Sequence, residues 1–284
     1  MKNFSGEYFR ESICAVVVTF GRDDLLKELI QNFSEQTLRP NKVLIIDNGN
    51  SKLSFGDKFD FVILKRLPRN LGSAGGYYFG ISLAERFADF VFTSDNDTLY
   101  EKDAIEKLYN AFFELSKNFN VGAVRCAWEN FEGERFCEVF SSVWTGVLIS
   151  SRVFNVVGFP KRDFFLYADD DEFFTRMTKS GFKFFMVKDA KYKRRPQEHK
   201  IKRRFFGRYI SFYEDDFRNY YSLRNEVFLA FYSDPRRIPK VIRRAILMLF
   251  YLSDKRSVIL EAFFHGLFGI LGENKKYSPN SEKS

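Results

Sequence analysis

Short apolar runs alternate with segments of helical periodicity along the first half of the chain. Residues 13–18 (ICAVVV) and 42–47 (KVLIID) are largely apolar and rich in β-branched side chains, which is typical of strands buried on both faces. Between them, the apolar residues of segment 23–36 recur every three or four positions, as in an amphipathic helix. Further strands are predicted over 61–65, 89–93, 121–128 and 143–150, and further helices over 75–90, 102–119 and 172–180. This order predicts an α/β fold with a mostly parallel sheet flanked by helices.

The pattern changes at about residue 209. Aromatic and charged residues mix over segment 209–228, and two strongly apolar helices are then predicted over 239–252 and 257–271. Helices this apolar either are buried against a partner surface or lie in a membrane interface. The chain is therefore divided into an α/β domain, a helical C-terminal appendage and a disordered polar tail, over residues 1–208, 209–272 and 273–284.

Charge and cysteine content narrow the class of protein. The 284 residues carry a net charge of +8, with basic residues concentrated in segment 188–208, which suits a nucleic acid, a diphosphate ligand or an acidic membrane face, or is simply a solvated loop. Cys14, Cys126 and Cys137 lack paired spacing, which argues against a disulfide framework or zinc site and indicates a reducing compartment. We expect no signal peptide and no spanning helix, hence a cytoplasmic protein.

Polar residues follow several of the predicted strands. Thr19, Asp47 and Asp95 lie at strand ends, and Asn70 follows the third strand within a few residues. Ligands of parallel α/β sheets bind at the carboxyl ends of the strands. The four positions therefore predict one binding site at this edge of the sheet.

Asp95-Asn96-Asp97 is the strongest candidate for metal binding. Two carboxylates two residues apart at a strand end can share a hard divalent cation, Mn²⁺ or Mg²⁺, which would neutralise charge on a departing diphosphate. The alternative is a loop that caps the helix starting at Lys102.

Two other segments carry candidate chemistry. The consecutive acids Asp169–Glu172 follow an apolar segment and could supply a general base, or could simply favour the N-terminal end of a helix. The glycine-rich segment 69–76 turns into a helix whose N-terminus attracts phosphate or sugar oxygens, or it is only a tight turn. Its glycines follow the third strand and not the first, which counts against an NAD site.

The order of these segments resembles that of the inverting family 2 glycosyltransferases of GT-A fold, and most closely the rhamnosyl- and galactofuranosyltransferase branch. The resemblance runs from Ile13 to Glu226 and is carried by the segments AVVVTFGR, VLIIDNG, RNLGSAGGYYFG, FTSDND, SSVWTGVLIS, FFLYADDDEFFTRM and YYSLRNEV. It implies that residues 1–208 form a GT-A catalytic domain, with a nucleotide-sugar half over about 1–97 and an acceptor half over about 98–208.

The resemblance also implies a role for individual residues of the donor site. Thr19 and Asp47 would contact the nucleotide base and ribose, with Asp47 accepting from a uracil or thymine imide. Arg69 and Asn70 would border the nucleotide and diphosphate, and Asp95 would touch ribose or sugar hydroxyls. Trp144 and Thr145 would lie where donor sugar meets acceptor, and Gly75 would be a further substrate-binding residue. Asp97, with Asp95, would hold the metal.

On the acceptor side, the resemblance makes Asp170 the general base, with Asp169 and Glu172 orienting the acceptor or supporting the base. Family members often carry a metal-binding histidine about twenty residues later, but this sequence has Lys193 or Arg194 there. Either His199 reaches the metal, or basic side chains stabilise the diphosphate directly. Arg224 and Asn225 could brace the acidic segment from a helix.

We therefore expect a metal-dependent enzyme that moves a sugar from a UDP- or dTDP-sugar to a hydroxyl of a glycan or lipid-linked glycan. The apolar C-terminal helices would attach it to the cytoplasmic membrane face or form a homo-oligomer. The alternatives are a sugar-phosphate nucleotidyltransferase, and a non-catalytic protein that binds nucleic acid or membrane. Nucleic acid is the less favoured partner, because the acidic cluster just upstream of the basic segment would repel phosphates.

Overall fold

The computed structural model describes residues 11–49, 59–195, 200–205 and 208–278. The chain divides into two compact units. The first comprises Met1–Asn70, Gly76–Pro160 and Phe173–Arg195, and the second Leu71–Gly75, Lys161–Glu172 and Pro196–Ser284. This division does not fall at residue 208, where the sequence suggested a boundary, because residues 161–172 join the C-terminal elements.

The first unit is built on a mixed sheet of nine strands among the described residues, in the order β3-β2-β1-β4-β8-β6-β9-β5 with β7 beside β9. Its strands are β1 (Ile13–Thr19), β2 (Lys42–Asp47), β3 (Val62–Arg66), β4 (Phe90–Asp95), β5 (Thr98–Tyr100), β6 (Val121–Trp128), β7 (Phe136–Glu138), β8 (Val147–Ser150) and β9 (Lys183–Arg194). The strands from β3 to β4 are parallel, whereas β8 is antiparallel to both β4 and β6. The prediction of an α/β fold with a mostly parallel sheet is confirmed: β1, β2, β3, β4, β6 and β9 run in one direction, and β5, β7 and β8 run against them.

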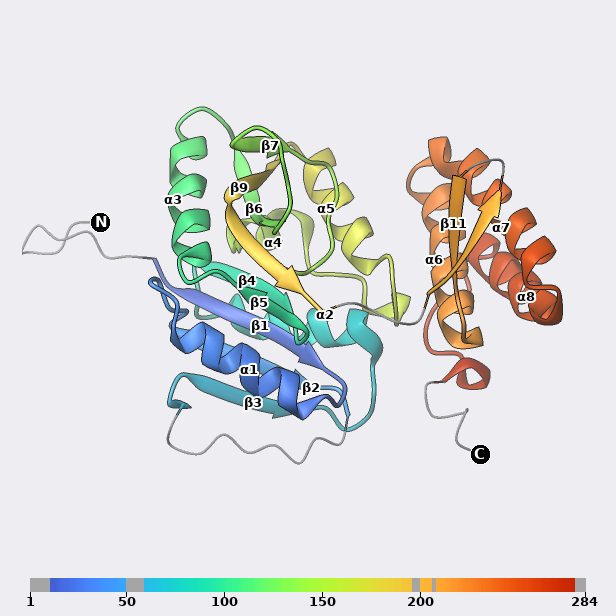
Figure 1. Ribbon diagram of the computed structural model, residues 1–284, viewed down its shortest axis with the longest axis horizontal. Helices are drawn as coiled ribbons and strands as arrows, with labels where there is room; N and C mark the ends of the chain where they lie inside the picture. The colour runs from blue at the N-terminus through green and yellow to red at the C-terminus, as the bar shows by residue number, and fades with distance from the viewer. Residues whose placement is uncertain (1–10, 50–58, 196–199, 206–207, 279–284) are drawn as a thin grey trace, which may run out of the picture. The chain divides into compact units, whose positions relative to one another are not determined.

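Helices cover both faces of this sheet (Figure 1). They are α1 (Asp23–Ser34), α2 (Gly72–Ala84), α3 (Ala104–Ser116), α4 (Arg152–Val157) and α5 (Asp169–Lys179). Alternate residues of β1 point to opposite faces, as the pleat requires. Ala15 and Val17 join a core with α1 and α3, while Cys14 and Val16 join a core with α2, α4 and α5.

Helix α2 lies unusually close to the sheet because it presents glycines to it. A Cβ at Gly76 would stand 2.5 Å from Cγ1 of Val18, and one at Gly80 would stand 2.6 Å from Cγ1 of Val16. No side chain fits at such distances, so glycine is needed for the approach. The glycine-rich segment therefore serves helix packing near the end of β1.

The second unit contains a hairpin and three long helices. They are β10 (Lys200–Phe205), β11 (Arg208–Tyr213), α6 (Asp216–Tyr232), α7 (Ile238–Tyr251) and α8 (Arg256–Leu267). The helices share a core that includes Tyr221, Met248 and Ile259. Within the described residues, no helix has the length and apolarity needed to cross a membrane.

Two predictions for this region are wrong. Residues 209–213 were expected in a helical region but form a strand that pairs with β10, in which Phe212 enters the core while Ser211 is exposed, as the alternation of a strand requires. The tail was expected to be disordered from residue 273, but Lys275–Tyr277 form a 3₁₀ turn. Tyr277 is buried there and stacks on Tyr220 at 4.4 Å between ring centroids.

Candidate donor and acceptor sites

Three strands bring the predicted donor-site residues to one edge of the sheet in the first unit. Strand β1 lies between β2 and β4, all parallel, with Thr19 in register with Asp47 and Val18 in register with Asp95. Because the chain passes from β1 to β2 and β3 on one side of β1 and then returns to β4 on its other side, a crevice is expected at the carboxyl ends of β1 and β4. Nδ2 of Asn96 donates to Oγ1 of Thr19 at 2.9 Å, which ties the turn after β4 to the end of β1.

Asp47 is a fixed hydrogen-bond acceptor in this cluster. Its side chain is fully buried, Oδ1 accepts from the backbone N–H of Gly49 at 3.0 Å, and Oδ2 lies 3.6 Å from Nε of Arg66. The N–H of Asn48 donates to the carbonyl of Thr19 at 2.8 Å, so the backbone just past Asp47 is held against β1. The carboxylate is thus set in one orientation before any ligand binds.

Asp95 is held by three side chains from different elements. Tyr77 donates to Oδ1 at 3.0 Å, while Thr145 and Arg194 donate to Oδ2 at 2.6 and 2.7 Å. Tyr77 was not predicted from the sequence, although a residue directly after Gly75 and Gly76 lies in the part of α2 that packs close to the end of β1. The contact with Thr145 places that predicted residue in the site.

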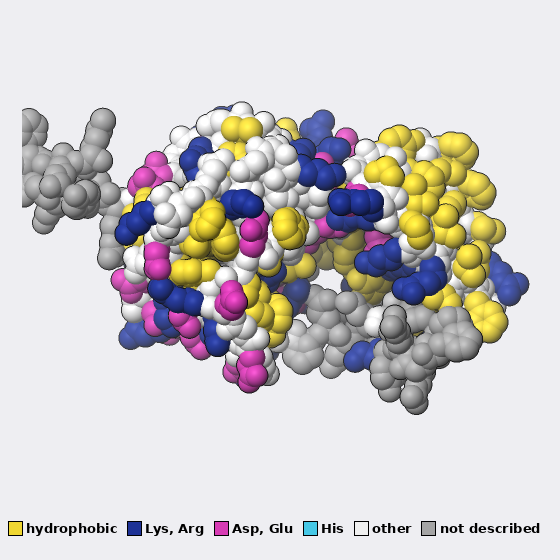
Figure 2. All heavy atoms as spheres, turned by 90° about the horizontal axis from the view of Figure 1, so that it is seen from above, with side chains coloured by type: hydrophobic (Ala, Val, Ile, Leu, Met, Phe, Trp, Pro, Cys, Tyr) yellow, Lys and Arg dark blue, Asp and Glu magenta, His cyan; other side chains and the backbone are white. Residues whose placement is uncertain are grey.

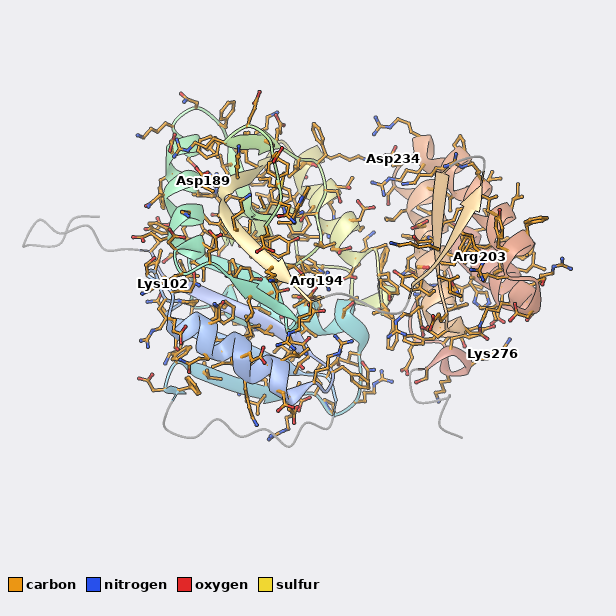
Figure 3. All side chains as sticks on the ribbon, viewed as in Figure 1. Lys102, Asp189, Arg194, Arg203, Asp234 and Lys276 are labelled. Carbon is orange, nitrogen blue, oxygen red and sulfur yellow. The ribbon has the colours of Figure 1, made fainter. Side chains whose placement is uncertain are left out.

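Arg194 bridges the two carboxylates of the Asp95-Asn96-Asp97 triplet. Besides its bond to Asp95, its Nε donates to Oδ1 of Asp97 at 3.1 Å, and Arg22 approaches Oδ2 of Asp97 at 3.6 Å. Strand β9 brings Arg194 there, because it is paired with β5 so that Arg194 lies opposite Thr98, one residue after Asp97. Figure 3 shows Arg194 at the end of β9.

The electrostatics of this cluster are those of a neutralised acidic pair. Asp97 is only 5% exposed, so its charge is poorly solvated. Desolvation lowers the pKa of Arg194, but the charges of Asp95 and Asp97 outweigh it, so the pKa is raised above its ordinary value. The guanidinium is therefore a permanent cation between the carboxylates.

A divalent cation fits this site only by displacing Arg194. The carboxylates are the hard oxygen donors that Mn²⁺ and Mg²⁺ prefer. Their facing oxygens, however, already bind the guanidinium, and the described part of the chain holds no group of three His, Cys, Asp or Glu side chains placed for a metal. His199, the predicted third ligand, lies outside the described residues.

Trp144 is a buried aromatic residue that supports Tyr77. Its ring is 4% exposed, stacks on Tyr77 at 4.9 Å, and packs against Phe173 and Phe174 at 5.3 and 5.1 Å between centroids. It stabilises Tyr77, which in turn binds Asp95. Thr145 directs its hydroxyl to Asp95, whereas Trp144 stacks on Tyr77. That both residues lie where donor sugar meets acceptor stays a prediction.

The segment Arg69–Gly75 follows β3, as predicted. Arg69 is exposed and Asn70 half-buried, and both belong to the first unit. Gly72 has φ +71 and lies so close to Phe165 that a Cβ would stand 1.8 Å from its carbonyl oxygen, which also accepts from the N–H of Ala74 at 3.2 Å. Gly75 is buried, and a Cβ there would stand 2.5 Å from Cβ of Leu71. The first turn of α2 is thus packed against Phe165 and Leu71 of the same chain.

The acidic segment Asp169–Glu172 belongs to the second unit. Asp169 and Glu172 are buried, with 2% and 5% exposure, and Lys161 lies 3.3 Å from Oε1 of Glu172. Arg237 forms an ion pair with Asp171. Asp170 is half-buried, and its Oδ1 accepts from the backbone N–H of Asp171 at 2.8 Å.

A strained stretch of backbone precedes these acids. Phe165, Tyr167 and Ala168 all have positive φ, at 61°, 68° and 64°. Left-handed conformations of non-glycine residues cost free energy and persist only when the surroundings impose them. The stretch therefore needs an external support.

Arg224 and Asn225 provide that support from α6, as the sequence predicted. Nδ2 of Asn225 donates to the carbonyls of Phe164, Leu166 and Tyr167 at 3.0, 2.8 and 2.8 Å, and Arg224 donates to Phe164 at 2.8 Å. Burial lowers the pKa of Arg224, whose guanidinium lies 4.7 Å from the ring centroid of Tyr221. These contacts fix the entry into the acidic helix.

Known proteins resemble this chain in sequence and in fold. Residues 14–136 match the family described as glycosyl transferase family 2. The chain is 26% identical over 247 residues to galactofuranosyltransferase GlfT1 of Mycobacterium tuberculosis, covering 76% of this chain and 81% of that protein. GlfT1 of Mycolicibacterium smegmatis is 24% identical over 251 residues, covering 77% and 83%.

Solved structures share the fold. GalNAc-T7, solved with UDP, GalNAc and Mn²⁺, superposes with a TM-score of 0.62 at 12% identity, over 93% of this chain and 57% of its own. TarS of S. aureus superposes with a TM-score of 0.52 at 17% identity over 64% of this chain, and the match spans only 36% of TarS. The chain is therefore similar to glycosyl transferase family 2 over residues 14–136 and shares its fold with GalNAc-T7 and TarS, and these findings support a glycosyltransferase that uses a nucleotide sugar.

Proposed function

We propose that the enzyme transfers a sugar from a UDP- or dTDP-sugar to a hydroxyl group with inversion at the anomeric carbon. The observation that carries this proposal is the cluster of Thr19, Asp47, Asp95 and Asp97 at the ends of β1, β2 and β4. Support comes from the galactofuranosyltransferase relatives and from a structure of TarS, of similar fold, solved in complex with UDP.

In this proposal Asp47 selects the base. Its carboxylate is an acceptor locked by Gly49 and Arg66, and uracil and thymine present an imide N–H that can donate to it. Adenine and cytosine have no imide, so a buried acceptor would discriminate against them. Thr19 at the end of β1 would contact the ribose, and Arg69 and Asn70 would border the diphosphate.

Asp170 is the proposed general base. Its carboxylate removes the proton from the acceptor hydroxyl, whose oxygen attacks the anomeric carbon from the side opposite the leaving nucleoside diphosphate. The C–O bond to the diphosphate breaks as the new C–O bond forms, so no covalent enzyme intermediate is needed. Asp169 and Glu172, both buried, orient Asp170 and the acceptor.

Charge on the leaving diphosphate is neutralised at the Asp95–Asp97 triplet. Arg194 and Arg22 place positive charge there from the chain itself. Mn²⁺ or Mg²⁺ would be held by Asp95 and Asp97 in place of Arg194, and when bound it would supply Lewis-acid stabilisation of the diphosphate. Thr145 and Tyr77 keep Asp95 oriented toward the same point.

A glycan or lipid-linked glycan of the cell envelope is the proposed acceptor. Support for it comes from two relatives that are named galactofuranosyltransferases. The matches to this chain cover 81% and 83% of the lengths of those relatives. A panel of nucleotide sugars, scored for nucleoside diphosphate release with and without divalent cation, would identify the donor. NMR of the product would then report the anomeric configuration.

Asp170→Asn provides the sharpest single test of the mechanism. We expect kcat to fall by about 10²-fold or more, the contribution typical of a general base, with nucleotide affinity nearly unchanged. Asp171→Asn is the matched control: it removes the next carboxylate and its ion pair with Arg237, yet transfer should stay within about threefold of wild type. Equal loss in both variants, or full turnover by Asp170→Asn, would refute this assignment.

A further inference from the structure

The second unit exposes a hydrophobic surface along two helices. Helix α7 presents Ile242, Ile246 and Phe250 at four-residue intervals, with Phe250 70% exposed. The α8 region presents Leu260, Phe264 and Phe268 at the same spacing, with Phe268 67% exposed. Four-residue spacing keeps each trio within about a quarter of a turn. We refer to these six residues as the apolar face; Figure 2 shows hydrophobic side chains gathered on this part of the protein.

The apolar face is not the side on which α7 and α8 pack into the core of the second unit. The opposite sides of the same helices are already buried in the core shared with α6, through Val241 and Met248 of α7 and Val258 and Ala262 of α8. The helices are therefore packed on one side and apolar on the other. Soluble monomers rarely expose contiguous apolar surfaces of this kind without a partner.

Basic residues border the apolar face. On α7, Lys240 and Arg243 are exposed and follow the apolar stripe around the helix, and neither forms an ion pair with a described carboxylate. On α8, Arg256 is exposed and lies one turn before Leu260, in line with the apolar stripe. Helix α7 contains no acidic residue.

The acidic residue of α8 is already neutralised. Oε2 of Glu261 binds Lys276 at 2.6 Å and Tyr277 at 2.9 Å, and Oε1 accepts from Asn274 at 3.2 Å. The hydrogen bonds to Lys276, Tyr277 and Asn274 overcome desolvation and lower the pKa of Glu261, which therefore stays paired. The charge bordering the apolar face is consequently positive.

This combination fits an anionic lipid surface better than a second copy of the chain. A twofold pairing of the apolar faces would offer the cations of α7 a copy whose own α7 carries no acid to pair with them. Helix α7, with 14 residues, is about 21 Å long, shorter than the hydrocarbon core of about 30 Å. It can therefore lie along the membrane interface but cannot cross it.

We infer that α7 and α8 form a peripheral docking surface for membranes that contain anionic phospholipids. Phe250, Phe264 and Phe268 enter the boundary between headgroups and acyl chains, while Lys240, Arg243 and Arg256 contact the headgroup phosphates. This inference does not depend on which sugar the enzyme transfers. It explains why two helices are apolar on both sides.

Co-sedimentation of the full chain with vesicles tests the inference. The wild type should bind vesicles containing phosphatidylglycerol, bind pure phosphatidylcholine more weakly, and lose part of its binding at high salt. The variant Ile246→Ser with Phe250→Ser should partition at least about tenfold less, since two largely exposed side chains no longer insert. Phe140→Ser is the matched control, because Phe140 is 69% exposed in the first unit, and its binding should equal that of wild type.

A second variant keeps the apolar residues and reverses the charge. Lys240→Glu with Arg243→Glu should abolish the preference for phosphatidylglycerol while the melting temperature stays unchanged, since both side chains are exposed. Equal binding by wild type and the Ile246/Phe250 variant would overturn the inference, as would an equal loss in Phe140→Ser. So would a dimer in sedimentation equilibrium without lipid that the Ile246/Phe250 variant dissociates, since the second copy would then be the partner.

Discussion

In the wild type the guanidinium of Arg194 neutralises the carboxylates of Asp95 and Asp97. The variant Arg194→Ala should leave this role to a bound metal ion. Removing the guanidinium leaves Asp97, 5% exposed, with only the more distant Arg22 at 3.6 Å. Breaking a fully buried ion pair costs about 3–5 kcal/mol. Because Arg194 is 30% exposed and Arg22 remains, we expect about 2 kcal/mol in the absence of metal.

The same free energy fixes the expected effect on metal binding. In the wild type a cation must displace Arg194 from both carboxylates, whereas in the variant it binds them directly. A difference of about 2 kcal/mol corresponds to roughly 30-fold tighter Mn²⁺ binding by Arg194→Ala. Mn²⁺ should therefore raise the melting temperature of the variant by several degrees, and raise that of the wild type much less when no nucleotide is present.

Titration of Mn²⁺ into nucleotide-free protein, followed by the EPR signal of free Mn²⁺ and by thermal unfolding, measures both quantities without any turnover. Arg195→Ala is the matched control, since Arg195 pairs with Glu28 on the surface at 53% and 47% exposure. It should cost at most about 0.5 kcal/mol and leave Mn²⁺ affinity unchanged. If Arg194→Ala bound Mn²⁺ no more tightly than the wild type, the idea that Arg194 competes with the metal for Asp95 and Asp97 would be refuted.

Two further predictions concern the support of the acidic segment and the thiols. Asn225→Ala leaves the carbonyls of Leu166 and Tyr167 without their amide donor, so urea denaturation should show about 2–3 kcal/mol lower stability, and kcat should fall more than nucleotide affinity. Burial raises the pKa of Cys14 to about 12 and raises that of Cys126, so at about pH 8 both stay almost entirely protonated. Ellman's reagent should then modify only Cys137 in the folded protein and all three thiols after denaturation; rapid modification of all three in the folded state would contradict the burial.

Local pattern and parallel-strand geometry account for the part of the donor site that could be predicted. Strands β1, β2 and β4 are uniformly buried, so they appear in the sequence as apolar runs, and each ends at a polar residue. Parallel neighbours must end at the same edge, which brings Thr19, Asp47 and Asp95 together without further information. Arg224 and Asn225 were found only through the family resemblance, since a buried arginine in a helix has no signature in a single sequence.

Sheet order and long-range register could not be predicted, because they depend on pairings between segments far apart in the chain. Strand β8 lies antiparallel between β4 and β6 and makes the sheet mixed. Its four residues, VLIS, would suit a parallel strand equally well, so the sequence does not indicate the direction of pairing. The hairpin strand β11 was assigned to a helical region because four of its six residues are aromatic or basic, as in the stretch that follows it. In neither case does the local pattern specify the partner.

The position of Arg194 shows how much depends on such a pairing. Strand β9 pairs with β6 through Val187 opposite Cys126 and then, after an irregularity, through Lys191 opposite Ala127. Beyond it, β9 pairs with β5, and alternation along the strand puts Arg194 and Lys193 on opposite faces. Lys191, two residues from Lys193, points away from the site and donates to the carbonyl of Phe131 at 3.1 Å. If the register of β9 shifted by one residue at that irregularity, Lys193 would face Asp95 and Asp97 in place of Arg194. The compact ammonium group of a lysine cannot bridge both carboxylates in the way the guanidinium does. The register of β9, and not the basic composition of segment 188–208, therefore decides which cation neutralises the site.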